Sequence, residues 1–144
     1  MNPNSCCKGV AFLRISLAAT MLFVHGLPKL QNFSSIAGQF PDPIGLGSSL
    51  SLGLVVFAEF FCSLLILLGI GTRLAAIPVI TTMAVAFFIF HSTDPFAVKE
   101  LAFIFLLGFT AIFITGTGQY PVLKNVLPKT KSCTLNYLFE RDFD

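Results

Sequence analysis

Charged side chains are scarce in this chain of 144 residues. They make up 11% of it, whereas hydrophobic residues make up 55%. In soluble domains about a quarter of the residues are charged, so this composition excludes an ordinary soluble domain and predicts an integral membrane protein. The net charge is only +2. Because the basic residues are scattered near predicted membrane edges, we expect contact with the lipid bilayer and no nucleic acid partner.

Motifs of several enzyme classes are also missing. The chain has no glycine-rich phosphate loop, no nucleotide fingerprint and no serine nucleophile elbow. Its two histidines, His25 and His91, lack the tight spacing of a metal or haem motif, so we expect neither group. No CxxC pair occurs, and we expect free thiols in place of a disulfide framework. The cysteines are Cys6, Cys7, Cys62 and Cys133.

Four long apolar runs are the main positive feature of the sequence. Each approaches the roughly 20 residues that a helix needs to cross a bilayer. They predict an all-α, four-helix transmembrane bundle within residues 1–120, followed by a polar tail over 121–144 that includes a short surface helix. Pro28 is expected to end or kink the first span. Residues 29–47 are expected to form a loop, with FSSIAGQF over 33–40 as a candidate short amphipathic helix at the interface. The predicted spans are 9–27, 48–69, 74–90 and 96–115.

The first apolar run has a second interpretation, as a cleaved signal peptide. Arg14 interrupts it, and no convincing small-x-small cleavage site follows, so we expect it to remain as a span. Basic residues near span ends predict that both termini are cytoplasmic. On that side lie Lys8, Arg73, Lys124, Lys129, Lys131 and Arg141, against Lys29 and Lys99 outside.

Glu59 stands near the middle of the second predicted span. A charge at that depth costs on the order of 3 kcal/mol on insertion scales, so it needs a partner within the protein. Counting about 1.5 Å per residue places Arg14 roughly 9 Å and Glu59 roughly 16 Å from the cytoplasmic edge. Because a long guanidinium side chain spans that difference and pairs well with a carboxylate, we predict an Arg14–Glu59 ion pair.

A second polar group, the outer cluster, is predicted where the first and third spans end and the fourth begins. Glu100 is its deepest member and is expected to pair with His25 or Lys29. One interpretation is a site for protons or a quinone head group, because histidine titrates near neutral pH. The other is that these are ordinary interfacial side chains. The outer cluster comprises His25, Lys29, His91, Asp94, Lys99 and Glu100.

Several short segments, in their order and spacing, resemble one known family. Besides Arg14 they are HGLPKL over 25–30, AEF around Glu59, LLGIGTRLAA over 67–76, KELA over 99–102 and GTGQY over 116–120. Together they resemble the DoxX family of small bacterial membrane proteins, over about residues 10–120. The resemblance implies a four-helix bundle in a bacterial inner membrane. Its matching polar positions are Arg14, His25, Lys29, Glu59, Arg73 at the membrane edge, and Glu100.

The resemblance also implies a redox association, since relatives called DoxD form the membrane subunit of a thiosulfate:quinone oxidoreductase. We expect no intrinsic cofactor, a quinone as the candidate bound molecule, and other membrane subunits or a second copy as partners. Two functions are consistent with the sequence. One is a redox-associated subunit of a larger complex that handles quinone or protons while a partner supplies electrons. The other is a non-catalytic accessory subunit in which Arg14 and Glu59 only hold helices together. A transporter is disfavoured because four short spans leave little room for alternating access.

Overall fold

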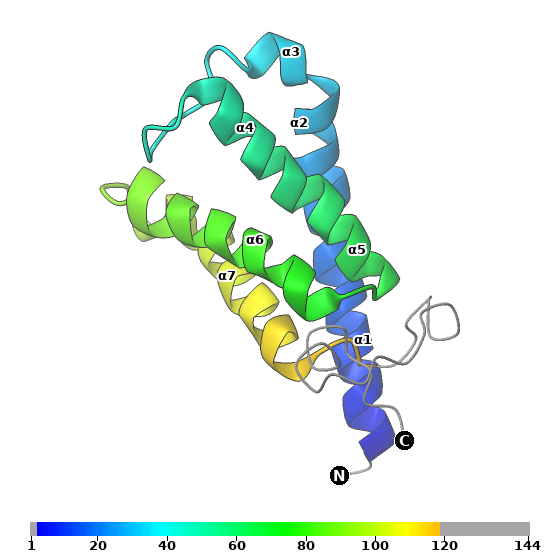
Figure 1. Cartoon of the computed structure of the whole chain (residues 1–144). Coiled ribbons are helices and arrows are strands. Elements are labelled where there is room, and N and C mark those ends of the chain that lie inside the picture. Colours follow the sequence, from blue (N-terminus) through cyan, green and yellow to red (C-terminus); the bar gives the residue numbers. More distant parts are fainter. Residues whose placement is uncertain (1–2, 119–144) are drawn as a thin grey trace.

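The computed structural model describes residues 3–118, which form helices and loops without any strand. Figure 1 shows the chain. We write η for a π-helical turn, in which the backbone bonds reach five residues back. The elements are α1 Pro3–Thr20, η1 Met21–Gly26, α2 Leu27–Gln31, α3 Phe33–Ile36, α4 Ser48–Val56, η2 Phe57–Cys62, α5 Ser63–Leu68, α6 Thr72–Val85, η3 Ala86–Phe90 and α7 Phe96–Thr115.

Four continuous helices in this part of the chain are long and apolar enough to cross a bilayer. They confirm the predicted all-α, four-helix transmembrane fold. Three of them begin and end within two residues of the predicted spans. The predicted tail over 121–144 lies outside the described residues. The four helices are Lys8–Gln31, Ser48–Leu68, Thr72–Phe90 and Phe96–Thr115.

The first helix departs most from its predicted bounds, because it continues through Pro28. Proline has no N–H to donate and its ring crowds the preceding turn. In this chain η1 lies directly before it, and the N–H of Leu27 bonds the carbonyl of Leu22, five residues back. This wider turn accommodates the proline, so α2 extends the helix to Gln31. Of the two expected effects of Pro28, an end of the span at this residue is wrong, and Lys29 therefore lies on the helix. The loop expected over 29–47 is wrong in its first part, because α2 reaches Gln31 and α3 follows at Phe33–Ile36.

A tight turn makes the second and third spanning helices antiparallel neighbours. Gly69 and Gly71 connect α5 to α6 in the left-handed region, with φ of 73° and 52°, which favours glycine. Since the four helices alternate in direction, the beginning of α1 and the end of α7 lie at the same end of the bundle (Figure 1). We call this the terminal end, comprising residues 8–17, 65–76 and 112–118. The opposite, loop end comprises residues 29–50 and 86–99.

The helices pack through small side chains and a few large apolar ones. Helix α6 lies along α7 (Figure 1), α1 contacts both α5 and α7, and η1 contacts η2. Small residues allow close approach of membrane helices. Many large apolar side chains, such as Phe12 and Phe88, are exposed, as is normal for helices that contact lipid. The buried core includes Ala18, Met21, Ala58, Ala76, Val79, Phe105, Phe109 and Ile112.

Candidate functional site

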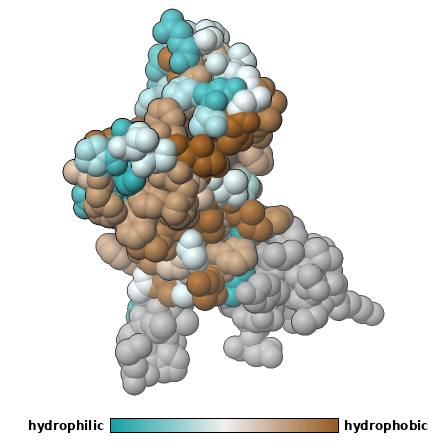
Figure 2. Space-filling model, turned by 90° about the vertical axis from the view of Figure 1, so that its left-hand side faces the viewer, coloured by the Kyte–Doolittle hydropathy of each residue, from teal (hydrophilic) through white to brown (hydrophobic). Residues whose placement is uncertain are grey.

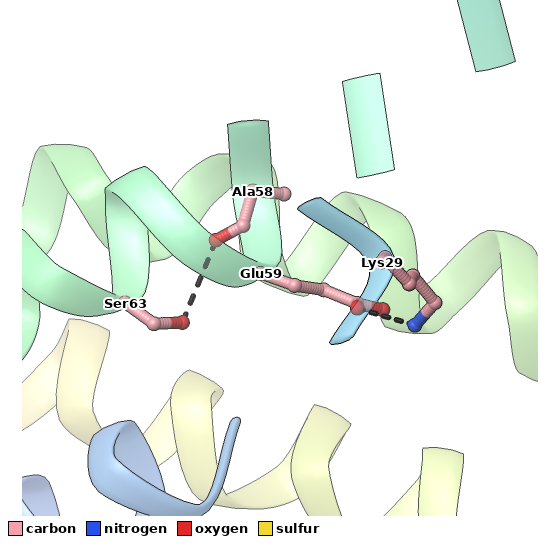
Figure 3. A network of polar contacts seen from close by, with 4 residues as sticks. All are labelled: Lys29, Ala58, Glu59 and Ser63. Atoms are coloured by element: carbon pink, nitrogen blue, oxygen red, sulfur yellow. Dashed lines mark hydrogen bonds and ion pairs between the residues drawn. The ribbon is translucent and has the colours of Figure 1, made fainter. Parts of the chain in front are cut away.

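Glu59 forms an ion pair with Lys29. Figure 3 shows the Lys29 ammonium, from α2, directed at the Glu59 carboxylate, from η2. The Glu59 side chain is only 5% exposed and that of Lys29 is 26% exposed. The pair joins the first spanning helix to the second, and it neutralises a carboxylate that lipid would exclude.

The predicted pairing of Glu59 with Arg14 is wrong. Arg14 is fully buried and donates from Nε and Nη1 to backbone carbonyls at the terminal end of the bundle. One of these acceptors is Ile66, seven residues beyond Glu59, which corresponds to about 10 Å along a helix. Two features of the first helix explain the error. It begins well before the bundle does, so Arg14 is shallower than estimated, and it passes through Pro28, which brings Lys29 to Glu59.

Two π-helical turns meet at the level of the ion pair. The backbones of η1 and η2 approach so closely that a Cβ added at Gly26 would lie 2.5 Å from the carbonyl oxygen of Glu59. Only glycine fits such a backbone contact. The hydroxyl of Ser63, the first residue of α5, donates to the carbonyl of Ala58 in η2 at 3.5 Å, as Figure 3 shows. Single π turns are common at functional sites, because they redirect side chains within a helix.

A pocket of about 350 Å³ lies beside the ion pair at the loop end. Its walls come from α4, η2, α6 and η3 and from the loop after α3. Lys29 and Glu59 are its charged lining residues, and Ser51, Thr81 and Thr82 supply hydroxyl groups. The rest of the lining is apolar: Phe40, Pro41, Pro43, Ile44, Leu54, Val55, Met83, Val85, Ala86 and Phe90.

The outer surface around this pocket mixes hydrophobic and hydrophilic patches. Figure 2 views the molecule from the side on which the loop ends of α4 and α6 lie, and hydrophobic surface (brown) lies between two hydrophilic patches (teal). Leu54 and Phe90 line the pocket and are each 47% exposed, although both belong to spanning helices. The pocket thus combines a buried ion pair with apolar walls that reach the lipid-facing surface, an arrangement suited to an amphipathic ligand.

The remaining members of the predicted outer cluster lie at the loop end but do not form one site. His91 Nδ1 lies 2.7 Å from an Asp94 carboxylate oxygen. Lys99 donates to the Ser92 carbonyl at 3.3 Å, and its Nζ lies 5.4 Å from the centre of the Phe87 ring.

Two further residues do not follow their prediction. His25 packs edge-on against Phe105 of α7, with ring centres 5.4 Å apart. Glu100 is exposed, and its predicted pairing is wrong: within the described residues no ion pair joins it to Lys29, which pairs with Glu59, or to His25, which packs against Phe105. Of the outer cluster, only Lys29 lines the pocket.

At the terminal end, two arginines bond the carboxyl ends of other helices. Arg14 donates to Ile66 at 2.7 Å and to Leu67 at 2.8 Å in the last turn of α5, and to Thr117 at 2.9 Å after α7. Arg73, predicted to mark the membrane edge, donates to Phe113 at 3.1 Å in the last turn of α7. Helix carboxyl ends carry unpaired carbonyls and partial negative charge, so these guanidinium groups are strongly favoured there. Both arginines therefore have structural contacts.

No cluster suited to a metal ion occurs within residues 3–118, where groups of three or more histidine, cysteine or acidic side chains are absent. Cys62 is a buried free thiol. Cys6 and Cys7 lie in the first turns of α1, and Cys133 lies outside the described residues.

Comparison with known proteins agrees with the resemblance noted in the sequence. A family model described as DoxX matches residues 9–92, more than half of the chain. The chain belongs to the DoxX family. This DoxX match contains the first three spanning helices, the ion pair and all the pocket-lining residues, whereas α7 lies beyond it, so it is shorter than the resemblance over 10–120. No curated protein and no solved structure matches the chain.

Sequence reasoning missed two elements of the site. One is Gly26, whose role is visible only when η1 and η2 are placed together. The other is Asp42, whose carboxylate accepts hydrogen bonds from the Leu46 and Gly47 N–H groups and from the Ser51 hydroxyl. The sequence PDPIGLG contained a signal for the second, because an aspartate followed by glycines often forms a side-chain-stabilised turn.

Proposed function

We propose that this DoxX-family chain is a redox-associated membrane subunit that binds a quinone beside the Lys29–Glu59 pair. The electrons come from a partner subunit, and the part of this chain is to bind and orient the quinone. The observation that carries the proposal is the buried ion pair at the wall of a mainly apolar pocket. Its volume of about 350 Å³ lies within the range of about 300–1,000 Å³ typical of small-molecule sites.

The charge of the pocket favours a neutral head group with hydrogen-bond acceptors. Lys29 has three N–H donors, so it can pair with Glu59 and still donate to a ligand oxygen. Glu59 balances the lysine charge, which removes the net positive charge that an anionic head group requires. A quinone offers two carbonyl acceptors on a neutral ring, and Leu54 and Phe90, which line the pocket and are exposed, offer its apolar tail a surface toward lipid.

Quinone content tests this proposal directly. After gentle solubilisation and purification with native lipid, the protein is extracted and its quinones are quantified by mass spectrometry. We expect bound quinone in the unsubstituted chain and a loss of about tenfold or more in Glu59→Gln, because the substitution leaves Lys29 without its carboxylate and rearranges the polar wall.

The matched control is Glu100→Gln, which makes the same chemical change at an exposed carboxylate outside the pocket. We expect it to retain its quinone. Equal quinone content in Glu59→Gln, Glu100→Gln and the unsubstituted chain, or no quinone in any of them, would overturn the proposal.

A second function, that of an accessory subunit which stabilises a larger membrane complex, is supported by Arg14. This buried charge donates to the backbone carbonyls of Ile66, Leu67 and Thr117 and does not line the pocket. An accessory role, in which Arg14 and Glu59 only hold helices together, predicts that Arg14→Leu or Glu59→Leu loses the chain and its attached subunits from the membrane, whereas Glu100→Gln loses neither. Identification of the proteins that copurify with each variant separates the two functions.

We further propose that both termini face the cytoplasm of a bacterial inner membrane. The support is the basic residues of the terminal end, such as Lys8 and Arg73, together with those of the tail. Labelling of Cys6 and Cys7 by a membrane-impermeant maleimide tests this orientation. We expect labelling in inverted vesicles and none in intact spheroplasts, and the reverse result would refute it.

A further inference from the structure

The segment Phe40–Ile44 forms one wall of the pocket at the loop end. Phe40, Pro41, Pro43 and Ile44 all line the pocket, while Asp42 between them does not. The two prolines fix φ along this segment, which makes it stiff. We call residues 40–44 the strap, because it connects the turns after α3 with the loop that leads into α4.

Asp42 ties the strap to the first turn of α4. Its Oδ1 accepts hydrogen bonds from the Ser51 hydroxyl at 2.7 Å and the Leu46 N–H at 2.9 Å, and its Oδ2 accepts one from the Gly47 N–H at 2.6 Å. Gly47 has a φ of 95°, a conformation that favours glycine. Ser51 is buried and lines the pocket itself. One side chain thus connects two walls of the pocket.

We propose that Asp42 latches the strap over the loop end of the pocket, so that ligands exchange through the lipid-facing opening beside Leu54 and Phe90. This inference concerns access to the site of the proposed function and names its route of entry. By this route a hydrophobic ligand dissolved in the bilayer reaches the Lys29–Glu59 pair without crossing water, because the strap lines the loop end of the pocket. Asp42 acts as a positioning residue, since it lies outside the pocket lining.

A cysteine inside the pocket measures this access. Thr82 is half-buried and lines the pocket. The tryptic peptide over residues 74–99 contains no native cysteine, so mass spectrometry measures the labelling of Thr82→Cys separately from that of the native cysteines. The protein is placed in lipid nanodiscs and treated with a membrane-impermeant or a membrane-soluble maleimide. With Asp42 intact, we expect the membrane-soluble maleimide to react fast and the membrane-impermeant maleimide to react slowly.

Replacement of Asp42 is expected to open the aqueous route. Asp42→Ala removes every hydrogen bond of the latch. It should raise the rate at which the membrane-impermeant maleimide labels the cysteine at position 82 about tenfold or more, and leave the rate of the membrane-soluble maleimide unchanged. Asp42→Asn keeps one oxygen acceptor and should give an intermediate rate. Ser51→Ala, which removes one bond, should give the smallest increase and tests the latch if the other variants fold poorly.

The matched control is Asp94→Ala, another carboxylate at the loop end, which pairs with His91 and does not line the pocket. We expect it to leave both rates unchanged. The inference is overturned if the impermeant reagent reacts equally fast with and without Asp42, or if Asp94→Ala has the same effect as Asp42→Ala. Absence of quinone would refute the proposed function while leaving this access measurement intact, so the two failures are distinguishable.

Discussion

The two ends of the bundle pair their buried charges with different kinds of group. At the terminal end, the Arg14 guanidinium donates to backbone carbonyls of α5 and of the segment after α7. Toward the loop end, Lys29 pairs with the mid-span Glu59, side chain to side chain. A backbone carbonyl has a fixed position and carries no titratable charge, whereas two side chains can separate and accept another partner. The contrast indicates a rigid terminal end and an adaptable loop end.

The backbone is also more regular at the terminal end than around the pocket. Within the described residues, η1 and η2 meet at the ion pair and η3 contributes to the pocket wall, whereas the helix turns around Arg14 are regular α-helix. A π turn is energetically unfavourable beside a regular one and persists where the surrounding packing requires it. The irregular backbone therefore coincides with the pocket, where an exact side-chain direction matters most.

Replacement of Arg14 should have the largest effect on stability. Arg14→Met leaves the carbonyls of α5 without their charged donor, and a hydrogen bond to a charged group contributes about 1.5–3 kcal/mol, so we expect a loss of roughly 3–5 kcal/mol. Thermal unfolding of the detergent-solubilised protein measures it. Arg14→Lys, which keeps the charge with fewer donors, should lose less. An unfolding midpoint of Arg14→Met equal to that of the unsubstituted chain would contradict the rigid role of the terminal end.

Disruption of the contact between η1 and η2 should have the second-largest effect on stability. In Gly26→Ala the added methyl group meets the Glu59 backbone, which cannot move aside as a flexible side chain would, and overpacking typically costs about 1–3 kcal/mol. Gly53→Ala is the matched control, because no atom lies within 4 Å of its added Cβ and alanine favours a helix. The same unfolding assay should show a loss for the first and no loss for the second. Equal behaviour of the two variants would disprove the close contact.

Separation of the ion pair should have a smaller effect, because Lys29 is partly exposed. We expect Glu59→Gln to cost about 1–2 kcal/mol, and the double variant with Lys29→Met to recover part of it, since removal of both charges leaves none uncompensated. A double-mutant cycle of unfolding free energies measures the coupling. Additive effects of the two substitutions would mean that the two side chains do not stabilise each other.

The smallest effect is the pH dependence of the strap. Hydrogen bonds from the Ser51 hydroxyl and from the N–H groups of Gly47 and Leu46 hold the pKa of Asp42 below its ordinary value. A lowered pKa stabilises the latched form above the unfolded value of about 4, and this contribution disappears as the pH falls through the folded-state pKa. Carbon-13 NMR titration of the Asp42 carboxyl should show the lowered value, and Ser51→Ala should raise it. An unchanged titration in Ser51→Ala would be inconsistent with the latch.

Hydropathy predicted most of the fold because hydrocarbon excludes charged side chains and unpaired backbone groups, so that each spanning segment must be an apolar helix. The helices of residues 48–68 and 96–115 begin and end almost where their apolar runs do. Glu59 was also identified correctly as a charge that needs a partner, since its mid-span position is evident from the sequence alone. The partner of Glu59 was not identified, because the choice between Arg14 and Lys29 depends on how far the first helix extends at each of its ends.

The sequence by itself determined that four apolar helices cross a membrane and that a carboxylate lies among them, because burial of a charge in hydrocarbon is costly in any arrangement. Only the tertiary structure decided that Glu59 pairs with Lys29, that Gly26 permits two backbones to touch, and that Asp42 connects two walls of one pocket. These contacts depend on π turns and on the relative height of neighbouring helices. A shift of one helical turn moves a side chain by about 5.4 Å, which is enough to exchange one partner for another.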